Sequence, residues 1–517
     1  METTQTMTKL SRFETWLCVA GWSGAVFYSI YCVHLSTDRY FRDYDDAYSD
    51  FAPGWSFVKR KVDVSDEEWR IWIPLMFQLV PWIVVQVFVS QCLKILCHNK
   101  TLLCSWYAAL SVIFLWNYFG LLSTLCTLLL PCISCLLASL RSKVISWIVH
   151  TATLALIYYA KVSDVIFREW LMLEDEEYFM LTAAVCWIQL RSISYSIDSI
   201  ESYKHIDVWG FIQDLLQNLA YCLYLPTLFL GPVILYQQFL DGVNKPFTQW
   251  GKEKSLRIFS SLVRYTFWMY FTQLALHYVY FNALRFHPEF VISLRPWAFY
   301  GLGYCMGQYF LNKYVVVYGL TSTVCRAEDI DAPPQPKCIG RIHLYSDMWK
   351  HFDRGLYKFL LRYIYIPCNP KSAIGKFFAS AVCFTFIYLW HGMHLYIFIW
   401  AFLNFFGLFI ETMAKSISGF FYQNIIGISI SPQNKRRLEC MISSPLLALS
   451  AISNFYFFAG DEIGHMYIYR VFRESWTATA TLLLALYGCC QTSTEIKQLE
   501  KGKVLNESKD KVKNKIL

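Results

Sequence analysis

The chain has 517 residues, of which 56% are hydrophobic and only 16% are charged, and its formal net charge is +8. A soluble protein carries about 25% charged residues, so this composition excludes an ordinary soluble domain. The lysines and arginines are spread over short loops and the tail, a pattern that follows membrane topology and argues against a nucleic-acid partner.

Apolar runs of about 18 or more residues recur along the chain, and they predict transmembrane helices. A bilayer admits only helices and closed barrels, and runs this long and continuous are typical of helices. We therefore predict an all-α polytopic membrane protein with about ten to twelve transmembrane or re-entrant helices. In chain order the apolar runs cover residues 16–34, 71–93, 102–140, 144–160, 211–240, 256–284, 297–320, 395–410, 443–459 and 477–490.

Two of these runs contain breaks. The run 102–140 is expected to turn near Gly120, as a hairpin of spans or as a re-entrant pair. In the run 211–240, Pro226, Gly231 and Pro232 interrupt the apolar sequence. A broken helix at membrane depth is tolerated only where it faces protein or a cavity, so this segment is expected to face the interior of the bundle.

The charges also predict an orientation. The loop 35–70 has an acidic excess, which favours the non-cytosolic side, whereas the lysine-rich tail 492–517 favours the cytosol. The tail ends in KNKIL, which resembles the dilysine signal that retrieves membrane proteins to the endoplasmic reticulum; the alternative is an ordinary basic tail. We expect one membrane-embedded domain over 1–491, a cytosolic C-terminus and residence in the endoplasmic reticulum membrane.

A histidine inside an apolar run is the first candidate for chemistry. His391 lies between Trp390 and Gly392, and an imidazole has a pKa near neutrality, so it can take a proton from a nucleophile. The alternative is a core histidine that donates to a neighbouring helix. His394 shares roughly the same helix face and is the rival, ranked below His391.

Three further residues have a functional and a plain interpretation. Asp353 would orient an imidazole, or it pairs with Arg354 at a surface. Asn454 is the single amide of its run, and it would donate to an oxyanion or bond to another helix. Cys338 lies in a polar connection, where a thiolate can ligate iron or be acylated, although the residues alone favour an ordinary cysteine. We find no P-loop, GxGxxG, HExxH or GxSxG motif in a suitable context.

Several segments resemble the membrane-bound O-acyltransferase family: YLPTLFLGPVILYQQF, LRSISYSID and the Trp-His-Gly motif around His391. The segments MWKHFDRGLYKFLLRYIYIP, YLWHGMHLYIFIWAFLNFFG and SPQNKRR are most similar to the branch that palmitoylates Hedgehog-type secreted proteins. The resemblance covers the chain from about the fourth apolar run onward. It implies helices around a central tunnel, a catalytic core at about 180–465, entry of palmitoyl-CoA from the cytosol and entry of the acceptor from the lumen.

The resemblance also implies a role for each candidate. His391 matches the catalytic histidine of the family, Asp353 its acidic partner, and Asn454 a polar residue near the thioester carbonyl. Trp349 matches a tryptophan beside the acyl-CoA site, and Cys338 a cysteine that ligates haem. The implied reaction is palmitoyl transfer to the amine of an N-terminal cysteine. The alternatives are transfer to a lipid or serine hydroxyl, and a catalytically silent regulator with the same fold.

Overall fold

The computed structural model describes residues 9–42, 50–97, 99–202, 207–424 and 431–516. Its helices and strands are, in chain order, α1 (Arg12–Arg42), β1 (Phe51–Ala52), β2 (Val62–Asp63), α2 (Glu67–Leu96), α3 (Lys100–Ser139), α4 (Lys143–Val162), α5 (Asp164–Leu171), α6 (Asp175–Ser202), α7 (Val208–Cys222), α8 (Leu225–Leu228), α9 (Tyr236–Asn244), α10 (Lys252–Ala275), η1 (Ala283–Phe286), α11 (Pro288–Ser293), α12 (Pro296–Ala327), η2 (Ile339–Arg341), α13 (Tyr345–His351), α14 (Arg354–Leu360), η3 (Leu361–Tyr365), η4 (Ile366–Cys368), α15 (Ala373–His391), α16 (Leu395–Asn424), α17 (Pro432–Arg473) and α18 (Trp476–Ile516).

The architecture is the all-α polytopic one that the composition predicts. Seven helices in the described part of the chain are long and apolar enough to cross a membrane: α1, α2, α3, α4, α15, residues Leu395–Ile417 of α16, and α17. The remaining apolar runs lie in α7 to α10, α12 and α18, which are shorter or contain more polar residues. Two helical segments of α3 meet at Gly120, where φ is 78° and ψ is 173°, at the position of the expected turn.

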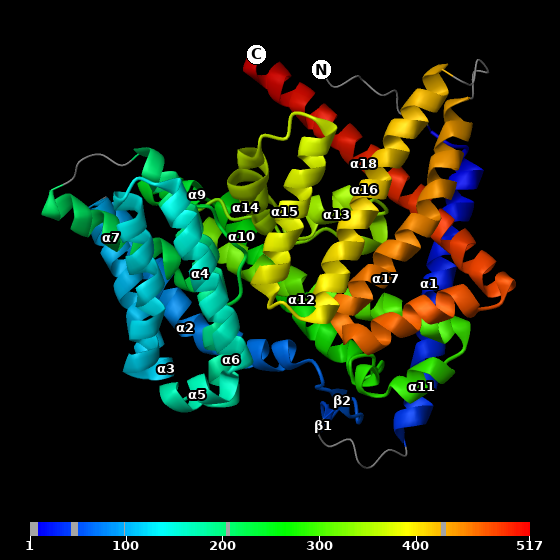
Figure 1. Ribbon diagram of the computed structural model, residues 1–517, viewed down its shortest axis with the longest axis horizontal. Helices are drawn as coiled ribbons and strands as arrows, with labels where there is room; N and C mark the ends of the chain where they lie inside the picture. The colour runs from blue at the N-terminus through cyan, green and yellow to red at the C-terminus, as the bar shows by residue number, and fades with distance from the viewer. Residues whose placement is uncertain (1–8, 43–49, 98, 203–206, 425–430, 517) are drawn as a thin grey trace.

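The helices form two groups with α12 between them (Figure 1). One group contains α2, α3, α4, α6 and α7, and the other contains α1, α16, α17 and α18. The antiparallel strands β1 and β2, which pair Phe51 with Asp63, lie at one end of the molecule. We call this the β end, and the opposite end, where α18 finishes, the tail end.

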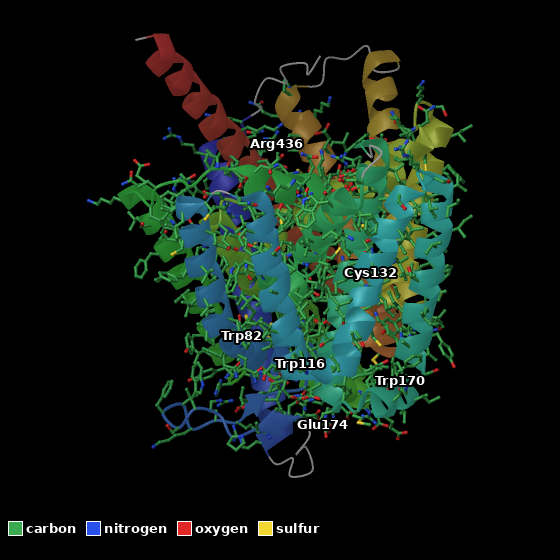
Figure 2. The ribbon with its side chains drawn as sticks, turned by 90° about the vertical axis from the view of Figure 1, so that its left-hand side faces the viewer. Trp82, Trp116, Cys132, Trp170, Glu174 and Arg436 are labelled. Carbon is green, nitrogen blue, oxygen red and sulfur yellow. The ribbon has the colours of Figure 1, made fainter. Side chains whose placement is uncertain are left out.

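Two labelled charged residues lie toward opposite ends of the molecule. In Figure 2, Arg436 of the basic segment 433–439 lies toward the tail end, and Trp170 and Glu174 lie toward the β end. This arrangement agrees in sense with the expected orientation, in which the acidic loop before α2 and the basic segment occupy opposite sides.

The predicted break in the run 211–240 is present between α7 and α9. Arg191 of α6 is 1% exposed, and its guanidinium donates to the backbone carbonyl of Cys222 at 2.9 Å and to the hydroxyl of Thr227 at 2.8 Å. It also donates to the Thr227 carbonyl. The Thr227 carbonyl also accepts from the Gly231 amide at 3.2 Å, so the Arg191 guanidinium supplies a donor to the Cys222 carbonyl and joins two parts of the broken segment.

Candidate active site

The main cavity lies where α12, α13, α14, α15 and α17 meet, and side chains of α1 and α18 also line it. Its volume is about 340 Å³, and its wall is mainly aromatic and aliphatic. Four of the five residues to which the resemblance assigns a role line this cavity, namely His391, Asp353, Asn454 and Trp349. The fold therefore gathers side chains from four separate elements around one apolar space.

His391 is placed by the end of its helix. It is the last residue of α15, and Gly392 follows with a φ of 115°, a left-handed conformation that glycine adopts readily. The imidazole packs against the rings of Phe457 at 5.0 Å and Trp400 at 5.6 Å between centroids. Within the described residues the imidazole has no hydrogen-bond partner, so a ligand in the cavity can bond to its nitrogens.

Asp353 is the N-cap of the short helix α14. Its Oδ1 accepts from the Leu356 amide at 2.8 Å, and its Oδ2 accepts from the hydroxyl of Tyr318 at 2.8 Å. No hydrogen bond joins Asp353 to His391, although both line the cavity. The carboxylate that was expected to pair with the imidazole is therefore oriented by other groups.

Asn454, Trp349 and His391 all contact the side chain of Trp400. The indole of Trp400 donates to Asn454 Oδ1 at 3.1 Å, and its ring lies 5.6 Å from the ring of Trp349. Asn454 Nδ2 donates to the carbonyl of Ser450 at 2.8 Å and to the sulfur of Met348 at 3.5 Å. A thioether is a weak acceptor, so a substrate oxygen can replace it as the partner of this N–H.

The rival histidine and the polar cysteine lie outside the cavity lining. His394 is exposed and stacks on Tyr396, with 5.4 Å between the ring centroids. Cys338 is exposed, and no three His, Cys, Asp or Glu side chains in the described residues gather as a metal site. Among the described residues, the surroundings of Cys338 do not support the haem that the resemblance implies.

The last helix packs against α13 and the segment that precedes it. Ser493 lies 2.8 Å from His343 Nδ1, and Lys497 forms an ion pair with Asp347. Helix α18 continues through the expected boundary at 491/492, so the first turns of the tail support the cavity wall.

Sequence reasoning missed the aromatic residues that complete the site, above all Tyr318 and Trp400. A signal was present for the first of these. Aromatic residues recur along α12 at spacings of four, with one spacing of six, and they line the cavity as Tyr300, Tyr304, Phe310, Tyr314 and Tyr318. This spacing places the aromatic residues on one face of the helix, but it does not predict that this face lies against Asp353.

The family model described as MBOAT, membrane-bound O-acyltransferase family, matches residues 135–452. The protein-cysteine N-palmitoyltransferase Rasp of Drosophila melanogaster is 32% identical over 85% of this chain and 88% of its own length. The protein-cysteine N-palmitoyltransferase HHAT of Mus musculus is 24% identical over 93% and 97%. The HHAT-like protein of Mus musculus is 26% identical over 75% and 76%. The chain belongs to the membrane-bound O-acyltransferase family and is a membrane-bound acyltransferase.

Proposed function

We propose that this protein transfers palmitate from palmitoyl-CoA to the N-terminal cysteine amine of a secreted Hedgehog-type signalling protein. The observation that carries the proposal is the imidazole of His391, which lies in the wall of an apolar cavity and has no hydrogen-bond partner among the described residues. The similarity to the two named protein-cysteine N-palmitoyltransferases supports the choice of donor and acceptor.

An apolar cavity suits a long acyl chain. Each buried methylene contributes about 0.8 kcal/mol, so a C16 chain binds through apolar contact and needs few polar groups. Trp349, which stacks edge-on against Phe384 at 4.9 Å, would border the acyl-CoA. The donor would enter from the cytosol at the tail end, and the acceptor from the lumen at the β end.

The reaction needs a base because an α-amine has a pKa near 8 and is largely protonated at neutral pH. The ammonium loses one proton to solvent, and the neutral amine nitrogen attacks the thioester carbon while His391 would take the second proton that the nitrogen gives up. The C–N bond forms, the C–S bond breaks, and the CoA sulfur leaves as a thiolate that accepts this proton from His391. Asp353 would act as the acidic partner of the site, and Asn454 would donate to the oxyanion of the tetrahedral intermediate.

The location follows from the same reasoning. A secreted acceptor is available in the lumen of the secretory pathway, so we place the enzyme in the endoplasmic reticulum membrane with its C-terminus in the cytosol. The side chains from residue 503 onward, including the lysines of the KNKIL terminus, lie outside the described residues.

Peptide acceptors test this proposal. Purified enzyme and palmitoyl-CoA are incubated with a peptide that begins with cysteine, with its N-acetylated form, and with a peptide that begins with serine. We expect amide-linked palmitate on the first peptide alone. Transfer to the acetylated peptide or to the serine hydroxyl would favour the other acceptor classes, and no transfer to any peptide would favour a silent regulator.

A further inference from the structure

Tyr318 is the side chain that forms a hydrogen bond to Oδ2 of Asp353. It lies on α12, is 3% exposed, and donates its hydroxyl proton to Asp353 Oδ2 at 2.8 Å. The other carboxylate oxygen caps α14 through the Leu356 amide. Hydrogen bonds to a carboxylate from fixed donors determine its orientation, and here one donor comes from the backbone and the other from Tyr318.

The ring of Tyr318 is itself fixed. It packs edge-on against Tyr314 at 5.3 Å and against Trp187 at 6.5 Å. A Cβ atom at Gly231 would come within 3.1 Å of the Tyr318 ring and 2.7 Å of the Trp187 ring, so the broken segment after α8 is also packed against it. The Tyr318 hydroxyl can therefore move only if these neighbouring side chains repack.

Trp187 connects this wall to the catalytic histidine. Its ring lies 5.6 Å from that of Trp390, and Trp390 precedes His391. An ionised carboxylate offers about four lone-pair sites, of which Tyr318 and the Leu356 amide use two. The remaining lone pairs are available to a group in the cavity that His391 also lines.

We propose that Tyr318 is a positioning residue for palmitoyl transfer, whose hydroxyl holds the Asp353 carboxylate in the orientation that the reaction uses. This inference rests on the proposed function, because it assumes that Asp353 acts in catalysis. In this proposal the hydrogen bond from Tyr318, and not a hydrogen bond to His391, determines the orientation of the Asp353 carboxylate.

Tyr318→Phe removes the hydroxyl and keeps the ring. We expect kcat to fall about tenfold or more, as for loss of a hydrogen bond to a charged group, with KM for palmitoyl-CoA and for the cysteine peptide within about twofold of wild type. In an Asp353→Asn background the same substitution should cost less than about twofold, because no carboxylate charge remains to be oriented.

Tyr309→Phe is the matched control. Tyr309 lies on the same helix, is buried, does not line the cavity, and its hydroxyl has no hydrogen-bond partner in the described residues. We expect wild-type kcat and thermal midpoint for this variant. The inference is overturned if Tyr318→Phe has the kcat of the control, or if it changes KM alone. It is also overturned if Tyr318→Phe lowers kcat in the Asp353→Asn background by the same factor as in wild type, or if the variant loses its thermal transition. If wild-type enzyme acylates no cysteine peptide, the proposed function fails. If wild type acylates it and Asp353→Asn is fully active, the proposed function stands and the inference about Tyr318 fails.

Discussion

Gly307 of α12 lies in the cavity wall at a point where added atoms would occupy the space for the acyl chain. A Cβ there would meet Ile339 Cδ1 at 3.3 Å and Phe458 Cε2 at 3.9 Å, so it fits with a small shift of a flexible side chain. Gly307→Val adds three carbons and removes room for about two or three donor methylenes, each worth about 0.8 kcal/mol. The ratio of kcat/KM for C16 to that for C12 donors should fall about 15- to 60-fold.

The assay measures peptide acylation with acyl-CoA donors of 10 to about 18 carbons. Gly307→Ala should shift the chain-length profile less than the valine variant. Gly24→Val is the control, because Gly24 of α1 has no atom within 4 Å of an added Cβ and does not line the cavity. An active Gly307→Val enzyme that keeps the wild-type chain-length profile would refute the placement of the acyl chain beside Gly307.

Three further predictions concern the supporting structure. Lys497→Glu should raise the KM for palmitoyl-CoA a few-fold, because the reversed charge repels Asp347. Asp347→Lys in that background should restore the KM. An unchanged KM in Lys497→Glu would show that this ion pair of α18 does not influence donor binding. Arg191→Met leaves the Cys222 carbonyl and the Thr227 hydroxyl without their buried donor, so it should cost about 1 to 3 kcal/mol and lower the thermal midpoint of detergent-purified protein; an unchanged midpoint would contradict that role. Burial raises the pKa of the Asp63 carboxyl to about 6. Its folded form therefore binds more protons than the unfolded form between about pH 4 and 6, and stability falls as pH rises across that window. Asp63→Asn should flatten this dependence in thermal melts, and a retained slope would assign it to another group.

The fold class followed from the sequence because lipid leaves few solutions. Long apolar runs must be helical, and the break at Pro226, Gly231 and Pro232 had to face the interior. Arg191 shows what such a pattern cannot supply. Its acceptors lie about 30 to 36 residues further along the chain, and only the packing of α6 against the broken segment brings them within reach.

The candidate site likewise combines residues that the sequence identifies with contacts that the sequence does not predict. His391 is visible in the sequence because a titratable side chain beside Gly392 in an apolar helix needs a reason. Asp353 was recognisable as a candidate, but its partners were not, since Tyr318 approaches from a helix 35 residues earlier in the chain. The oxyanion role of Asn454 was one of two interpretations of its sequence, and the role of Trp349 came from family resemblance. The structure adds Trp400 as the residue that both share with His391.

The most direct test of the central claim compares His391→Ala with His394→Ala in the cysteine-peptide assay. We expect His391→Ala to lower kcat by at least about 100-fold, because a general base is lost, and to retain donor binding. His394→Ala should keep the wild-type rate, because His394 is exposed and does not line the cavity. Equal rates for His391→Ala and wild type would contradict the assignment of His391 as the catalytic base.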